Sequence, residues 1–110
     1  MLLVKDEELF DLAPLIIEPM ILAVKVQETD SFLSRLNALP KEIQRKWKKT
    51  KRLLSNSTLG NGLEFKKWPL EKDVFSVKVD DNYRAHLAKA PLGEPWPAFA
   101  IGNHKEMGHG

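Results

Sequence analysis

The stretch that decides the fold runs from residue 74 to residue 87 and reads VFSVKVDDNYRAHL. Apolar and polar residues alternate on both sides of Asp80–Asn82, with the period of two that is typical of β-strands. Asp and Asn favour tight turns because their side chains bond to the turn's own backbone. The stretch therefore predicts a hairpin, with one strand over Val74–Val79 and the next beginning at Tyr83.

Further strand signals lie on both sides of this hairpin. Pro91–Pro97 is rich in Pro and Gly and is interpreted as a loop, which is followed by a last short strand over Ala98–Ile101. On the other side, a period-two alternation starts at Leu63 and ends at a turn over Pro69–Asp73. The segment after the predicted helices is therefore expected to be a three-stranded antiparallel meander.

Two helices are predicted before the meander. Thr29 or Asp30 is a suitable N-cap for a helix over Ser31–Leu39, and Pro40 suits the first turn of a second helix. Steps of three and four give the second helix an inner face, formed by Ile43, Trp47, Thr50 and Leu54. Residues 55–62 are expected to form a loop. Upstream, the apolar run Met20–Val26 predicts a strand that joins the same sheet.

The expected fold class is α+β, with one sheet covered on one face by the helical hairpin. A chain of 110 residues with 43% hydrophobic residues has room for one domain and one core. The absence of cysteine excludes disulfides and thiolate metal sites. No apolar run reaches the roughly 18 residues of a membrane span, and no signal peptide is recognised, so we expect a cytoplasmic protein without a membrane partner.

Charge is unevenly distributed. Residues 1–19 carry one basic and five acidic side chains, whereas residues 41–52 carry seven basic and one acidic. We interpret 1–19 as an acidic N-terminal extension and 20–110 as the domain, and the extension is a candidate to dock on the basic helix as a mild inhibitor. The basic block fits a polyanion or an acidic partner, or it is a solvated helix face.

The face of the sheet opposite the helices is where chemistry is expected. Arg84 and His86 share this face, as do Ser76 and Lys78 on the neighbouring strand, and Lys66 or Lys67 joins them. Cleavage of RNA by its own 2′-OH needs a proton acceptor, cations for the phosphate and a proton donor, which His, Arg and Lys supply without a metal or cofactor. In the alternative interpretation, Arg84 pairs with Asp80 or Asp81, and His86 takes no part in catalysis. The spacing of His104 and His109 is only a weak indication of a metal site.

Four segments resemble toxins of the RelE/ParE superfamily, which belong to bacterial type II toxin–antitoxin systems. The segments are LSRLNALPKEI (33–43), GLEFKKW (62–68), VFSVKV (74–79) with DNYRA (81–85), and IGNHKE (101–106). Together they cover about residues 20–106.

The resemblance implies a RelE-like fold and a toxin that is neutralised in a hetero-oligomer by a cognate antitoxin. The expected activity is that of a ribosome-dependent mRNA endoribonuclease acting in the A site. The alternatives are a ParE-like inhibitor of DNA gyrase and an inactive family member. Met107 stands where the family has a tyrosine, which shifts the acid–base role to His86 or His104. The expected catalytic residues are Lys67, Arg84, His86 and His104, and the expected RNA-binding residues are Lys66, Lys78, Arg45, Lys49 and Arg52.

Overall fold

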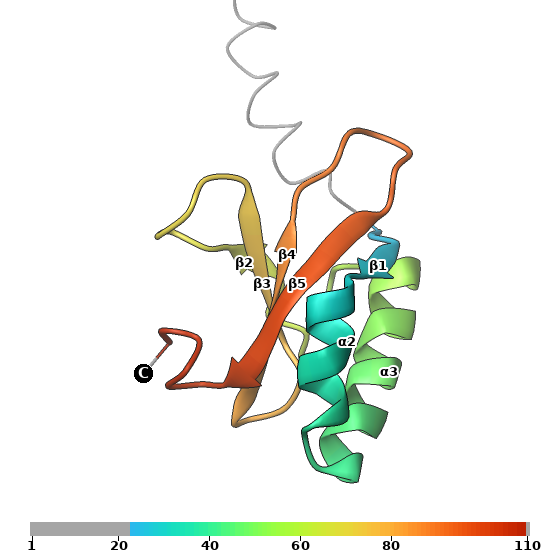
Figure 1. The fold of residues 1–110 in the computed structure, drawn as a ribbon. Helices are drawn as coiled ribbons and strands as arrows, with labels where there is room; N and C mark the ends of the chain where they lie inside the picture. Colours follow the sequence, from blue (N-terminus) through green and yellow to red (C-terminus); the bar gives the residue numbers. More distant parts are fainter. Residues whose placement is uncertain (1–22, 110) are drawn as a thin grey trace, which may run out of the picture.

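The computed structural model of the chain describes residues 23–109, and residues 1–19 of the expected extension lie outside them. The elements follow in the order β1 (Val26–Glu28), α2 (Asp30–Asn37), α3 (Lys41–Asn56), β2 (Lys66–Lys67), β3 (Val74–Lys78), β4 (Tyr83–Ala88) and β5 (Trp96–Asn103). The strands form one sheet in the order β1-β5-β4-β3-β2, in which β1 is parallel to β5 and the other pairs are antiparallel. The α+β class is confirmed (Figure 1).

The sheet is mixed and has five strands, so the three-stranded meander was an incomplete prediction. The segment after the helices contains four strands, because the alternation that starts at Leu63 also gives a strand, β2, which is limited to Lys66–Lys67 and pairs with β3. The last strand begins at Trp96, inside the expected loop, because Trp96 packs into the core with 8% of its surface exposed. Burial of this large aromatic side chain extends the strand beyond what the prolines on either side indicate.

The first strand is shorter and later than expected. Residues 20–22 of the predicted strand lie outside the described residues, and β1 begins only at Val26. Pairing sets these limits, because β5 runs beside β1 only from Val26 opposite Trp96 to Glu28 opposite Ala98. Before that point, the Val24 amide donates to the Leu54 carbonyl of α3 at 2.8 Å.

The helix predictions agree with the structure. Thr29 is the N-cap of α2, and its hydroxyl accepts from the Phe32 amide at 3.2 Å and donates to the Ala98 carbonyl of β5 at 3.0 Å. The cap therefore also fixes the helix to the sheet. The expected inner face of α3 is buried, and the helix continues to Asn56, two residues into the expected loop. Neither helix in residues 23–109 is long and apolar enough to cross a membrane.

The core lies between the helices and one face of the sheet (Figure 1). Phe32 and Trp47 from the two helices are fully buried, with ring centroids 4.9 Å apart. The sheet contributes its alternate residues, among which Val77, Ala85 and Leu87 are fully buried. The alternation that predicted the hairpin therefore also fixes which face meets the helices.

The second face of the sheet is more covered than expected. Ser76 and His86, which we expected to line an open polar surface, are only 1% and 5% exposed. The Trp68 ring lies 5.0 Å from the His86 ring, and the C-terminal residues 104–109 bring His109 against both. Figure 1 shows this C-terminal segment on the side of the sheet away from α2 and α3.

Candidate functional site

The pairing register places a row of polar residues on the face that carries no helix. Lys66 lies opposite Ser76, which lies opposite His86, and in the next row Lys78 lies opposite Arg84. Directly paired residues of antiparallel strands point to the same side of a sheet. Strands β2, β3 and β4 therefore present one common surface.

His86 lies at the centre of this surface and is buried. Its ring contacts the rings of Trp68 and Phe99, with centroids 5.0 and 6.3 Å away. Its Nε2 lies 3.1 Å from Nε2 of His109, so one ring donates a hydrogen bond and the other accepts it. Burial lowers the pKa of His86 below its ordinary value of 6.5, because desolvation penalises the charged ring.

His109 lies over His86 and is partly exposed. Its ring stacks on Trp68 with centroids 4.3 Å apart, and the His104 ring is 5.3 Å away. The pKa of His109 is lowered to about 4, first by burial and then by the positive charges of its neighbours, which are His86, Arg84, His104 and Lys66. Burial therefore favours the neutral form of His86 and His109, and Arg84 and Lys66 bring positive charge close to them.

The C-terminal segment that carries His109 is fixed at several points. Its base is held where the His104 amide donates to the Asn82 carbonyl at 2.6 Å, next to the β3–β4 turn. Asn103 and Glu106 bond reciprocally, side chain to backbone amide, at 2.7 and 3.0 Å. Glu106 also forms an ion pair with Arg35 of α2 at 2.6 Å. These contacts, Asn103 first, lower the pKa of Glu106.

The Arg84 side chain binds mainly to backbone carbonyls of the β3–β4 turn. Its Nη1 donates to the carbonyl oxygens of Asp80 at 2.7 Å, Tyr83 at 3.1 Å and Asp81 at 3.5 Å. Its Nη2 lies 3.9 Å from a Glu64 oxygen, and the side chain is 12% exposed. The expected alternative, pairing with Asp80 or Asp81, takes the form of bonds to their backbone rather than to their carboxylates.

The strand lysines differ in their surroundings. Lys78 forms ion pairs with Asp81 at 2.9 Å and Glu64 at 3.6 Å, and the bond to Asp81 raises its pKa. Lys66 is exposed on the same face as His86. Lys67 is also exposed, but its register position opposite Phe75 places it on the face of the sheet that meets the helices.

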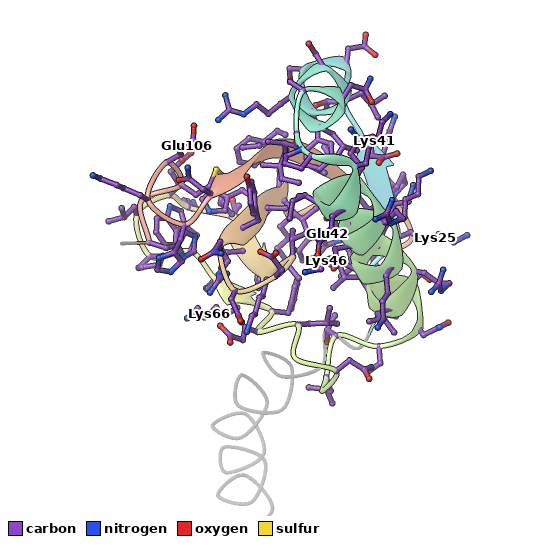
Figure 2. The ribbon with its side chains drawn as sticks, turned by 90° about the horizontal axis from the view of Figure 1, so that it is seen from below. Lys25, Lys41, Glu42, Lys46, Lys66 and Glu106 are labelled. Atoms are coloured by element: carbon purple, nitrogen blue, oxygen red, sulfur yellow. The ribbon has the colours of Figure 1, made fainter. Side chains whose placement is uncertain are left out.

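The basic helix residues form a separate surface. Arg45, Lys49 and Arg52 are exposed on the outer side of α3, and Lys49 also lines a cavity with Lys78 and Asp80 of the β3–β4 hairpin. Figure 2 shows Lys66 and Glu106 on one side of the molecule, Lys41 of α3 on the other, and Lys46 nearer the middle. Four expected site residues, Lys66, Arg84, His86 and His104, lie around His109 and form with it the histidine cluster. Arg45, Lys49 and Arg52 lie on the outer surface of α3, and Lys67 and Lys78 belong to neither group.

The contact of His109 with His86 was not predicted from the sequence. The sequence indicated His109 only as a weak candidate for binding a metal together with His104. In the structure its ring contacts that of His86, which lies 23 residues earlier in the chain. Among residues 23–109, no three His, Asp or Glu side chains are grouped as metal ligands would be.

No protein-family model, curated protein or solved structure matches this chain.

Proposed function

We propose that the protein is an endoribonuclease toxin of a bacterial toxin–antitoxin pair that cleaves mRNA on the ribosome. The observation that carries this proposal is the histidine cluster, in which three imidazoles from β4 and the C-terminal segment lie beside Arg84 and Lys66. The four segments that resemble RelE/ParE toxins point to the same activity.

The cluster has the groups that cleavage by the RNA's own 2′-OH requires. A neutral imidazole takes the 2′ proton while the 2′ oxygen attacks phosphorus and the bond from phosphorus to the 5′ oxygen breaks. A protonated imidazole gives its proton to the departing 5′ oxygen. The products are a 2′,3′-cyclic phosphate and a 5′-hydroxyl. Lys66 and Arg84 supply positive charge for the phosphate that gains charge during the reaction.

The outer surface of α3 supports binding of a large polyanion. Arg45, Lys49 and Arg52 are exposed there, and no ion pair joins any of them to another described residue. Such side chains contact phosphates without reading sequence. In the proposed function they hold ribosomal or messenger RNA, and the antitoxin would cover one of the two basic surfaces.

The test is controlled expression in bacteria followed by primer extension on cellular mRNA. We expect codon-linked cuts within translated frames that disappear in His104→Ala and His109→Ala. Lys105→Ala is the matched control, because Lys105 is exposed in the same segment and forms no ion pair with a described residue. Growth arrest without cuts, or cuts that persist in both histidine variants, would overturn the proposal.

One observation favours a second candidate, a toxin that binds DNA gyrase without chemistry. The Arg84 guanidinium is largely occupied by turn carbonyls, so its part in holding a phosphate is limited. Inhibition of gyrase supercoiling by the purified protein, with mRNA left intact, would support this candidate.

A further inference from the structure

We propose that His109 is the group that exchanges protons with the substrate RNA, and that His86 is a positioning residue, which orients His109 through the hydrogen bond between the two rings. This inference rests on the proposed endoribonuclease function and assigns roles within the cluster. It departs from the sequence expectation, which placed the acid–base work on His86 or His104.

Exposure separates the two roles. His86 is 5% exposed and lies beneath Trp68, Phe99 and His109, so a substrate cannot contact its ring directly. His109 is partly exposed at the surface of the same cluster. A phosphodiester that approaches this face therefore meets His109 before His86.

The hydrogen bond between the rings defines what His109 can do. Because Nε2 of each ring faces the other at 3.1 Å, one proton lies between them. When His109 donates from Nε2, its Nδ1 has the lone pair that accepts the 2′-OH proton. Once Nδ1 is protonated, the His109 imidazolium still donates from Nε2 to the neutral His86 ring, which stabilises the new charge.

The surroundings keep His109 neutral until an anion arrives. Burial is the main cause of its low pKa, and the electrostatic influence of His86, Arg84, His104 and Lys66 adds to it. A bound phosphate group would offset these charges and make protonation easier. His109 is thus a base in the free protein, and the bound phosphate enables it to carry the proton.

The contacts of Trp68 fix the orientation of His109. Its ring stacks on the His109 ring at an interplanar angle of 28°. The backbone next to His109 follows the same surface, because a Cβ at Gly108, where φ is +81°, would lie 3.3 Å from Trp68. The stacking leaves the imidazole little freedom to rotate away from His86.

The pair can be tested without any activity, by following the histidine ring signals of the full chain during an NMR pH titration. We expect His109 to titrate well below 6.5, to shift by half a unit or more in His86→Gln, and to titrate higher when inorganic phosphate is added. Lys105→Ala should leave the curve unchanged. A His109 titration that is identical in the wild type and His86→Gln would overturn the pairing.

Ribosome-dependent cleavage in a translation extract then tests the roles. General acid–base groups contribute about 10²–10⁴-fold to rates, so His109→Ala should lose a factor in this range. His86→Gln should lose less and should shift the pH–rate profile, which a merely structural defect would not do. If the wild type cleaves and His109→Ala cleaves equally well, this inference fails alone. If the wild type does not cleave, the proposed function fails and these roles fail with it.

Discussion

At the residue scale, one partly buried contact joins the first strand, β1, to the middle of α3. The indole nitrogen of Trp47 donates to Glu28 at 2.8 Å, and Lys51 donates to the other oxygen of the same carboxylate at 3.0 Å. Trp47 is fully buried, so its N–H has no access to water as a substitute. Glu28 therefore satisfies the polar atom of the largest fully buried side chain.

We predict that Glu28→Ala destabilises the protein by about 1–3 kcal/mol, which is the cost of leaving a buried donor unpaired. The free energy of unfolding in urea measures this change. Glu28→Gln is the matched control, because its amide oxygen still accepts from the indole, and it should lose clearly less. Equal losses in the two variants would show that the negative charge, rather than the acceptor, matters.

The sequence predicted only part of this contact. The spacing of Ile43, Trp47, Thr50 and Leu54 placed Trp47 on the inner face of its helix, since helical periodicity is a local property. The role of Glu28 depends on where β1 lies relative to α3, 19 residues later, which no local pattern contains. The pairing of His86 with His109 was missed for the same reason.

At the element scale, the C-terminal segment is attached to α2 through Arg35 and Glu106. We predict that Arg35→Ala speeds amide hydrogen exchange at Met107 and His109, whose amides donate to the carbonyls of Asn103 and His104. Exchange in the central strands should be unchanged, because the ion pair is exposed and contributes little to global stability. Lys105→Ala is the control, and unchanged exchange in Arg35→Ala would show that the Asn103–Glu106 bonds suffice to hold the segment.

The accuracy of the element predictions follows from the type of signal. Both helices were predicted to within a few residues, because capping and a 3.6-residue period depend only on residues that are close together in the sequence. The β3–β4 hairpin was predicted for a similar reason, since Asp80 accepts from the amides of Asn82 and Tyr83 and so closes the turn locally. The limits of β1, β2 and β5 depend on distant partners, and these were the limits that needed correction.

At the scale of the whole molecule, the sheet separates two basic surfaces. His86 lies on the face of the sheet that carries no helix, whereas Arg45 and Arg52 lie on α3, which packs on the other face (Figure 1). A long polyanion, which wraps around the protein, can contact both surfaces. Composition predicted the basic block of α3, but the division into two surfaces depends on how the helices pack on the sheet.

The histidine pair should also make global stability depend on pH. Burial holds the pKa of His86 below 6.5 and that of His109 at about 4, so in this range the unfolded chain binds more protons than the folded one. Stability therefore rises with pH from about 4 and levels off above 6.5. We predict a lower melting temperature at pH 5 than at pH 7, and a smaller difference in the double variant His86→Gln, His109→Gln. The test compares how the melting temperature of each protein changes with pH, so a loss of stability that is the same at both pH values cancels. An equal change in the two proteins would mean that His86 and His109 have the same pKa in the folded and unfolded chain.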